Sequence, residues 1–276
     1  MAAKEKTMHL GLIGYGSIAH SLIGMLPADR VPRVTVLVRP ASLDKAKHDA
    51  PPTGSGPAVQ VVSTLEGLLA ARTGVVVECA GHAAVARFGA DILRRGIPFI
   101  PASLGALADA DLHENMLQAA RTGGARLTIP AGAIGGLDLL QALALNGPPR
   151  VTYRGIKPPA AWKGSPADAI VDLDALATRT VFFSGTGREA ASAYPKNANV
   201  VAAIALSGGG FDHMKVELVA DPEARANSHS YEVISPICTY TIEIANSPNP
   251  ANPRTSMTTV ASLLLEILRH DPQEPL

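Results

Sequence analysis

Aromatic residues, cysteine and net charge are all scarce in this sequence. Phe, Trp and Tyr make up only 4% of the 276 residues, whereas 47% are apolar, and the chain holds 25 glycines and 22 prolines. Such a composition is typical of an α/β protein rich in Val, Ala and Leu with many tight turns, and it argues against a disordered or fibrous chain. The length suffices for about two domains, each with a hydrophobic core of its own.

Neither sign of charge prevails, because 24 Lys and Arg residues balance 24 Asp and Glu residues. A neutral chain lacks the electric field that attracts nucleic acids and anionic membrane surfaces. We therefore expect a small-molecule substrate as the partner, with no nucleic acid and no membrane.

Cysteines and long apolar runs are few as well. Cys79 and Cys238 lack the spacing of a disulfide framework or a zinc site, so we expect no metal and a reducing cytoplasm. Residues 1–6 lead directly into an apolar strand without the features of a secretory signal. Apolar stretches such as residues 200–206 end well short of the roughly 20 residues that cross a bilayer, and we interpret them as core elements.

Short apolar segments alternate with helical patterns in the N-terminal half of the chain. Uninterrupted apolar runs are typical of parallel strands that are covered on both faces. We predict such strands at residues 10–13, 34–38, 61–63, 74–79, 97–100 and 126–129. The alternation predicts an α/β fold whose N-terminal Rossmann domain, over residues 1–130, holds a doubly wound parallel sheet.

The pattern changes after residue 130, where Thr, Ser and Tyr become frequent in alternating segments. Alternation with period two indicates strands with one buried and one open face, and it occurs at residues 151–156, 214–219, 228–234 and 240–244. We predict a second α+β domain over residues 131–254 with a mixed or antiparallel sheet, through which we expect a homodimer to form. Residues 255–276 carry a final helix, at 258–268, which we expect to pack on the Rossmann domain.

A glycine-rich turn joins the first predicted strand to the first predicted helix. In a dinucleotide-binding turn of the form GxGxxA, the first glycine permits the tight turn and the second lets a pyrophosphate approach the backbone, while the third small residue allows close packing. Gly14, Gly16 and Ala19 occupy these positions. The pyrophosphate then binds at the helix N-terminus, beside Ser17 and Ile18. The context between strand and helix favours a dinucleotide site over a merely structural turn.

The residue after the second predicted strand distinguishes NAD from NADP. Sites selective for NAD usually carry Asp or Glu there, about 20 residues after the turn, to bind the ribose 2′-hydroxyl. This chain has Arg39, with Ser42 three residues later, and an arginine favours the 2′-phosphate of NADP. We therefore expect NADP or NAD, with NADP slightly favoured; the alternative is that Arg39 is a solvated loop charge.

Cys79, Ala80, Gly81 and His82 follow the fourth predicted strand. Ligands of doubly wound sheets bind outside the carboxyl ends of the strands, so this segment lies on the predicted cofactor side. For Cys79 a buried apolar role is favoured over a reactive one, because no base is adjacent in sequence. His82 is equally consistent with a cofactor contact and with a turn residue.

Three of the eight histidines remain as candidates for the reaction: His82, His213 and His229. His229 lies in a polar turn that enters a predicted strand of the second domain. We expect this domain to supply the catalytic groups, because the first is occupied with holding the dinucleotide.

Four further segments carry a family resemblance: PAGAIGGLD at residues 130–138, YPKNANV at 194–200, VADPE through NSH at 219–229, and NPRTS at 252–256. Behind a Rossmann turn, their order and spacing are similar to those of the L-aspartate dehydrogenase family over nearly the whole chain. The resemblance implies that Ala133 and Asn199 bind the dinucleotide and that His229 is the catalytic histidine. Two stretches, residues 207–210 and 235–238, depart from the expected family pattern.

The same resemblance implies oxidation of L-aspartate to iminoaspartate with NAD or NADP, followed by hydrolysis to oxaloacetate and ammonia, or the reverse amination. Hydride passes directly from Cα to the nicotinamide, so the protein has to position the reactants and manage protons. An imidazole with a pKa of about 6.5 suits this proton transfer. The two substrate carboxylates need cations or hydrogen-bond donors. The candidates are Lys157, Lys196, Arg254, Thr255 and Ser256. The three cations among them are equally consistent with surface charges.

Two alternatives from other classes stay open. One is a different Rossmann reductase of a small amino or oxo acid, similar to homoserine dehydrogenase or dipicolinate reductase, which a substrate panel would distinguish. The other is a non-catalytic NADP-sensing protein, which would bind the cofactor without turning over any amino or oxo acid.

Overall fold

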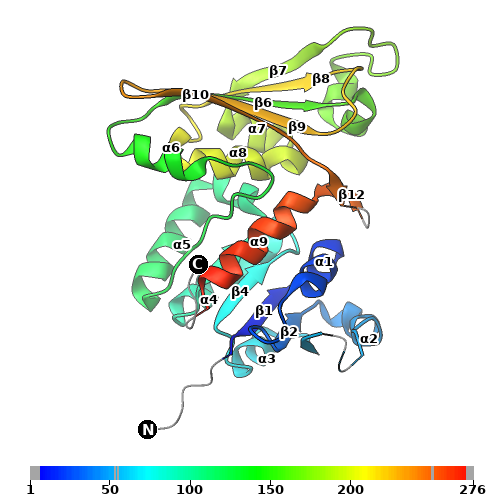
Figure 1. Ribbon diagram of the computed structural model, residues 1–276, viewed down its shortest axis with the longest axis vertical. Helices are drawn as coiled ribbons and strands as arrows, with labels where there is room; N and C mark the ends of the chain where they lie inside the picture. Colours follow the sequence, from blue (N-terminus) through cyan, green and yellow to red (C-terminus); the bar gives the residue numbers. More distant parts are fainter. Residues whose placement is uncertain (1–6, 53, 55, 250–251, 272–276) are drawn as a thin grey trace. The chain divides into compact units, whose positions relative to one another are not determined.

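Two units make up the chain in the computed structural model (Figure 1), which describes residues 7–52, 54, 56–249 and 252–271. The first unit comprises residues 1–130 and 260–276, and the second unit comprises residues 131–259. The C-terminal segment therefore belongs to the first unit, although it follows the second in sequence. Within the described ranges, no helix is both long and apolar enough to span a membrane.

The first unit is built on a parallel sheet. Its strands are β1 (His9–Ile13), β2 (Arg33–Leu37), β3 (Ala58–Val62), β4 (Val75–Glu78) and β5 (Phe99–Pro101). They lie in the order β3-β2-β1-β4-β5, and each neighbouring pair is parallel. The strand order reverses between β1 and β4, which is where doubly wound sheets bind their ligands. The structure thus confirms the predicted doubly wound parallel sheet.

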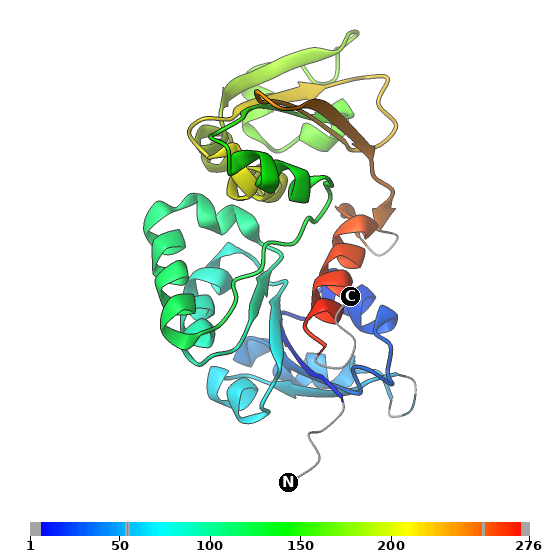
Figure 2. The same ribbon diagram turned by 60° about the vertical axis from the view of Figure 1, so that its left-hand side comes forward.

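Helices cover both faces of this sheet. They are α1 (Ser17–Met25), α2 (Leu43–His48), α3 (Leu65–Ala70), α4 (His82–Arg94), α5 (Ala110–Gly123) and α9 (Met257–Arg269). Figure 2 shows α4 and α5 on one side of the sheet and α1 with α9 on the other. Leu10 and Leu12 of β1 and Val75 and Val77 of β4 are consequently fully buried, which explains why these strands are uninterrupted apolar runs.

Residues 126–129 do not form the strand that the sequence predicts. Leu127 makes only an isolated parallel bridge with Phe99, and β5 itself ends at Pro101. Pro101 and Pro130 have no backbone N–H group to donate, so a longer ladder cannot form between the two segments.

Polar contacts hold the end of α9 within the first unit. Nε of Arg30 lies 2.7 Å from Oδ2 of Asp271, the residue that follows the helix by two positions. Nε2 of His270 lies 3.3 Å from Oγ1 of Thr128. Because Asp271 is only 4% exposed, its ion pair with Arg30 is shielded from solvent more than an ordinary surface pair.

The second unit is built on a mixed sheet. Its strands are β6 (Arg150–Lys157), β7 (Thr180–Thr186), β8 (Lys215–Ala220), β9 (Ser228–Ile234) and β10 (Thr239–Ala245), in the order β10-β9-β6-β8-β7. β6 and β8 are parallel and the other neighbours are antiparallel, which confirms the predicted mixed sheet. A separate antiparallel pair consists of β11 (Pro248–Asn249) and β12 (Asn252–Ser256).

Three helices lie together on one face of the second sheet (Figure 1). They are α6 (Leu137–Ala144), α7 (Gly187–Ala193) and α8 (Ala198–Ile204), and α8 continues into a π-helical turn at Ala205–Gly209. Short 3-10 turns lie at Pro40–Ser42, Leu104–Ala108, Pro159–Trp162, Pro166–Ala169 and Pro195–Asn197.

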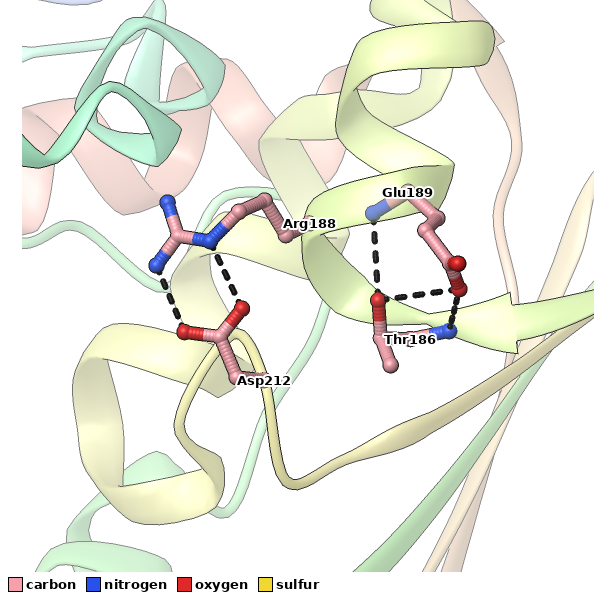
Figure 3. A network of polar contacts seen from close by, with 4 residues as sticks. All are labelled: Thr186, Arg188, Glu189 and Asp212. Atoms are coloured by element: carbon pink, nitrogen blue, oxygen red, sulfur yellow. Dashed lines mark hydrogen bonds and ion pairs between the residues drawn. The ribbon is translucent and has the colours of Figure 1, made fainter.

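Helix α7 begins with a capping box beside an ion pair (Figure 3). The backbone N–H of Glu189 donates to Oγ1 of Thr186 at 3.2 Å, and the backbone N–H of Thr186 donates to Oε2 of Glu189 at 2.7 Å. Arg188 donates to both carboxylate oxygens of Asp212, at 2.6 and 2.8 Å. The box satisfies N–H groups that a helix start leaves without a partner. The exposed ion pair orients the turn before β8 and contributes little to stability.

Candidate active site

The glycine turn lies at the end of β1, where the fold places a dinucleotide. Gly14 has a φ of +97° and donates its N–H to the carbonyl of Leu37 at 2.9 Å. A Cβ atom at Gly14 would lie 2.8 Å from the Cβ of Ala80, which excludes a side chain at this position. The segments that follow β1 and β4 are therefore in direct contact.

Helix α1 begins at Ser17, directly after Gly16, and Ile18 lies in its first turn. Among the described residues, no atom lies within 4 Å of a Cβ built at Gly16. The backbone is therefore open on the side from which a pyrophosphate would approach the helix N-terminus. Ala19, the third small residue of the motif, is fully buried. These surroundings are those that a dinucleotide turn requires.

A buried carboxylate, that of Glu78, shapes the segment after β4. Its Oε1 accepts hydrogen bonds from the backbone N–H groups of Ala80 and Gly81, both at 2.6 Å, and its Oε2 accepts from the N–H of Ser103 at 3.1 Å. Burial raises the pKa of Glu78, while these hydrogen bonds act in the opposite direction. Sequence reasoning missed Glu78, although a single carboxylate inside the apolar run GVVVEC was a signal that could have found it.

Cys79 and His82 lie on either side of this glycine turn after β4. Sγ of Cys79 lies 3.5 Å from the carbonyl oxygen of Ile13 and 3.8 Å from that of Gly14. Burial raises the pKa of the Cys79 thiol, so the thiol stays protonated and packs against β1 rather than acting as a nucleophile. Gly81 has a φ of +125°, and His82 is half-buried at the first position of α4.

Arg39 and Ser42 follow β2, the neighbour of β1 in the sheet. The side chain of Arg39 is exposed, and Ser42 ends the short turn Pro40–Ser42. This is the end of the sheet at which doubly wound folds bind dinucleotides. A role of Arg39 toward a 2′-phosphate stays a prediction.

The second unit holds a buried histidine in contact with a buried tyrosine. His229 of β9 is 8% exposed and Tyr153 of β6 is 1% exposed. The hydroxyl oxygen of Tyr153 lies 2.8 Å from Nδ1 of His229. In the antiparallel register His229 is opposite Gly155, and Tyr153 is opposite Tyr231. The contact therefore runs diagonally between two neighbouring strands, within the reach of aromatic side chains.

Lys157 lies two residues beyond Gly155 on the same face of β6. Its ammonium group donates a hydrogen bond to Oδ1 of Asn197 and lies 4.8 Å from the ring centre of Trp162. The indole N–H of Trp162 donates to the carbonyl of Val219 at 2.9 Å, which fixes the ring. Burial lowers the pKa of Lys157 to about 8, and no carboxylate of the described residues opposes this effect.

The charges of His229 and Lys157 are coupled. Burial, and then the nearby charge of Lys157, lower the pKa of His229 to about 4. The sequence-based expectation of an ordinary pKa for this imidazole is therefore wrong. That expectation took no account of burial or of a neighbouring cation, and both lower the pKa of a histidine. At neutral pH the cluster presents one cation, Lys157, and one neutral imidazole.

An amide missed by sequence reasoning, that of Asn246, links two of the resemblance segments. Its Nδ2 donates to the carbonyl of Ala133 at 3.0 Å. Its Oδ1 accepts from Oγ of Ser256 at 3.0 Å and from Oγ1 of Thr258 at 2.6 Å. The hydroxyl of Tyr231 also donates to this loop, at the carbonyl of Gly135, at 2.7 Å. The backbone that carries Ala133 is thus held by two side chains of the second unit.

The other predicted residues lie elsewhere in the second unit. Asn199 is exposed on α8, and His213 is exposed in the turn before β8, whereas His229 is buried on β9. Lys196 lies in the Pro195–Asn197 turn. Arg254, Thr255 and Ser256, which the sequence suggests as hydrogen-bond donors to the substrate, lie on β12. The side chains of three predicted substrate groups fall outside the described residues: Lys196, Arg254 and Thr255.

The two stretches that depart from the family pattern form local structure. Residues 207–209 lie in the π-helical turn after α8, where Gly208 has a φ of +131°, and Gly210 follows this turn. Residues 235–238 form the turn between β9 and β10, closed by a hydrogen bond from the N–H of Ser235 to the carbonyl of Cys238 at 2.9 Å. Among the described residues, no group of three or more His, Cys, Asp or Glu side chains could hold a metal ion.

Two family models match this chain. Residues 14–130 match "Homoserine dehydrogenase, NAD binding domain", and residues 138–270 match "Aspartate dehydrogenase, C-terminal". The first match contains the glycine turn, and the second contains both Lys157 and His229. The chain therefore combines a dinucleotide-binding unit with a second unit of a defined family.

Individual proteins are similar over almost the full length. L-aspartate dehydrogenase 2 of Bordetella bronchiseptica is 43% identical over 96% of this chain and 97% of that protein. L-aspartate dehydrogenase of Ruegeria pomeroyi is 42% identical over 93% of this chain and 90% of that protein. The crystal structure of aspartate dehydrogenase from Thermotoga maritima matches with a TM-score of 0.74 at 27% identity, covering 98% of this chain and 99% of that one.

Proposed function

This chain belongs to the L-aspartate dehydrogenase family, and from that premise we propose that it transfers hydride between Cα of L-aspartate and NAD or NADP. Iminoaspartate hydrolyses to oxaloacetate and ammonia, and the reverse reaction is the reductive amination of oxaloacetate. The observation that carries the proposal is a cation, Lys157, beside a neutral histidine, His229, on one buried sheet face. A cation such as Lys157 can bind a carboxylate of the dicarboxylate substrate, and a neutral imidazole such as that of His229 can form a hydrogen bond to the substituent of its Cα.

The first unit is proposed to bind the dinucleotide at residues 14–18. The open backbone at Gly16 and the N-terminus of α1 fit a pyrophosphate. When bound, NAD or NADP supplies the hydride acceptor or donor. The contact between Gly14 and Ala80 supports assigning residues 79–82 to the same site. Arg39 is proposed to contact the 2′-phosphate of NADP. Ala133 and Asn199 are proposed as further dinucleotide contacts because they match the family pattern.

Lys157 is proposed to bind one carboxylate of the substrate. Asn197 and Trp162 orient its ammonium group without neutralising it, so its charge is left for an anionic ligand. A partly desolvated ammonium interacts more strongly with a carboxylate than an exposed one does. The further groups proposed for the two carboxylates are Lys196, Arg254, Thr255 and Ser256.

His229 is proposed to act on the nitrogen or oxygen substituent of the substrate Cα. With a pKa of about 4 the imidazole is neutral at pH 7, so it does not repel the ammonium group of L-aspartate. A neutral imidazole can form a hydrogen bond to an oxygen at this position. Lys157 meanwhile supplies the positive charge that the carboxylate requires.

The test follows the absorbance of NADPH and NADH in the presence of oxaloacetate, with and without ammonia. The proposal predicts oxidation that requires ammonia, because the species reduced is the imine. Oxidation without ammonia would instead indicate reduction of the ketone and would contradict the proposal. A parallel panel of other oxo acids and aldehydes tests the alternative Rossmann reductases. Cofactor binding without turnover of any of these compounds would favour the sensing protein.

A homodimer is also proposed, through the face of the second sheet opposite α6, α7 and α8. Paired charges support a specific contact there, because Glu217 accepts from Arg154 at 2.7 Å and from Lys215 at 2.6 Å and could exchange partners across a two-fold axis. Light scattering after gel filtration tests the dimer, and a monomer at micromolar concentration would refute it.

The proposed location in the cytoplasm rests on the low cysteine content. The proposed partner is a small molecule and not a nucleic acid or a membrane, because the positive and negative charges of the chain balance.

A further inference from the structure

We propose that Tyr153 is a positioning residue that holds neutral His229 as its Nε2–H tautomer, so that the imidazole offers a substrate a hydrogen-bond donor, and that Gly155 leaves the space this contact needs. The role toward the substrate rests on the proposed function. The tautomer itself is a property of the protein without ligand, which allows the two to be tested separately.

The strand register brings the two side chains together. Gly155 lies opposite His229 in the β6–β9 pair, and Tyr153 lies two residues before Gly155 on the same face. The Tyr153 ring therefore extends over Gly155 to reach Nδ1 of His229 at 2.8 Å. A Cβ atom at Gly155 would lie 2.9 Å from the Tyr153 hydroxyl oxygen and 3.4 Å from a methyl group of Leu218. Any side chain at position 155 would push the hydroxyl away from the imidazole.

The direction of the hydrogen bond follows from the needs of the buried hydroxyl. Burial raises the pKa of Tyr153, so the phenol keeps its proton. Nδ1 of His229 is the hydrogen-bond partner that the described residues give this hydroxyl. If Nδ1 carried a proton and donated it, the O–H of Tyr153 would lose its acceptor, and a buried donor without a partner costs about 1–3 kcal/mol. Tyr153 therefore donates to Nδ1, and the single proton of the neutral imidazole lies on Nε2.

This arrangement gives His229 a defined chemical role. A neutral imidazole with its proton on Nε2 is a donor at that atom and cannot accept a proton there without first losing one. It therefore polarises an oxygen or a carboxylate of the substrate by hydrogen bonding, as neutral histidines do in other enzymes. General-base action from Nε2 would require the opposite tautomer.

The experiment uses the full chain labelled with 15N-histidine, without ligand, at pH 7. Long-range 1H–15N correlations distinguish Nε2–H from Nδ1–H imidazoles, and the His229→Asn variant identifies the signals of His229 among the eight histidines. The proposal predicts the Nε2–H pattern in the wild type. An Nδ1–H pattern in the wild type would overturn it.

Two variants test the roles of Tyr153 and Gly155. Tyr153→Phe removes the donor, and Gly155→Ala displaces it while the phenol stays present, so both should shift His229 toward the Nδ1–H tautomer. Unchanged His229 signals in both variants would overturn the proposal. Tyr231→Phe is the matched control, because it removes another buried hydroxyl, one that donates to the Gly135 carbonyl instead, and it should leave the His229 signals unchanged.

Kinetics distinguish this inference from the proposed function. In Tyr153→Phe, kcat should fall about 2- to 10-fold with a near-constant KM for oxaloacetate, as expected for loss of one hydrogen bond. A changed tautomer with unchanged kcat would refute the role toward the substrate. If the protein shows no amination activity but has the Nε2–H tautomer, the proposed function fails while the assignment of the tautomer stands.

Discussion

Replacement of Lys157 by methionine should stabilise the protein while weakening its affinity for the substrate. The pKa of Lys157 falls from its ordinary value of 10.5 to about 8 because the ammonium group is buried. Each pKa unit corresponds to about 1.4 kcal/mol, so the charged side chain costs at most about 3 kcal/mol at neutral pH. Its partial exposure and the cation–π contact with Trp162 reduce this cost. We therefore expect Lys157→Met to raise the free energy of unfolding by about 1–2 kcal/mol.

The stability gain has a defined pH dependence. Below a pH of about 8, Lys157 is protonated in both the folded and the unfolded state, so the full difference between variant and wild type is present. Between pH 8 and 10.5 the folded state has lost this proton while the unfolded state still binds it. The stability of the wild type therefore rises with pH in this window, and the difference from Lys157→Met shrinks.

Urea unfolding followed by tryptophan fluorescence is the assay. Trp162 is the single tryptophan of the chain and is 1% exposed, so its emission reports unfolding of the second unit. Lys163→Met is the matched control, because this lysine of the second unit is exposed and paired with the exposed Asp174, and it should change stability by less than about 0.5 kcal/mol. The reasoning would be refuted if Lys157→Met were no more stable than the wild type at pH 7 and the difference in free energy of unfolding between them did not vary up to pH 10.5.

Activity measurements complete this test. Loss of a charge-assisted hydrogen bond to a carboxylate, about 1.5–3 kcal/mol, should raise the KM for oxaloacetate about 10- to 100-fold. A stable variant with an unchanged KM would show that Lys157 does not contact the substrate. Lys163→Met should leave KM unchanged.

Further variants test the other proposed groups. His229→Ala should lower kcat by at least about 100-fold with little change in dinucleotide affinity, and the wild-type pH–rate profile should lack a step near the ordinary pKa of imidazole, since burial lowers the pKa of His229 to about 4; such a step that His229→Ala removes would contradict this. Arg39→Asp should raise the KM for NADPH and leave the KM for NADH unchanged, because the variant loses an ion pair with the 2′-phosphate that contributes about 1–3 kcal/mol. An unchanged ratio of the two KM values would mean that Arg39 does not contact the cofactor. Asn199→Ala should raise the dinucleotide Kd about 2- to 10-fold in titration calorimetry, and wild-type affinity would refute its assignment. Gly14→Ala, at a φ of +97° and against Ala80, should lower both melting temperature and dinucleotide affinity, whereas Gly24→Ala, in open space on α1, should be neutral or stabilising by up to about 1 kcal/mol; equal effects of the two would contradict the packing argument.

The parallel sheet could be predicted because its signals are local. Strands β1 and β4 are buried on both faces, and each is followed by a glycine turn and a helix, so pattern and context agree. β7 escaped prediction because a bulge between Val181 and Phe183 interrupts its alternation. The predicted strand at residues 126–129 failed for the opposite reason, since an apolar segment was present but nearby prolines limited its pairing.

The site could be predicted only in part, because its properties depend on contacts between distant segments. Tyr153 and His229 are 76 positions apart and meet through the β6–β9 register. Glu78 and Asn246 each bind backbone groups of segments that the sequence did identify. A local pattern can mark the segment that carries a functional group, but it does not contain the buried polar residue that holds the segment in place.

Burial also explains why the sequence assigned the wrong ionisation to His229. In the sequence, histidine suggests a group that titrates near neutral pH and lysine a permanent cation. Desolvation lowers the pKa of both groups, to about 4 for His229 and to about 8 for Lys157. The group closest to physiological pH in this cluster is therefore Lys157. If Lys157 binds the substrate carboxylate, the loss of activity above a pH of about 8 should report deprotonation of Lys157, and a KM for oxaloacetate that stays constant from pH 7 to pH 9.5 would show that the ammonium group plays no part in binding.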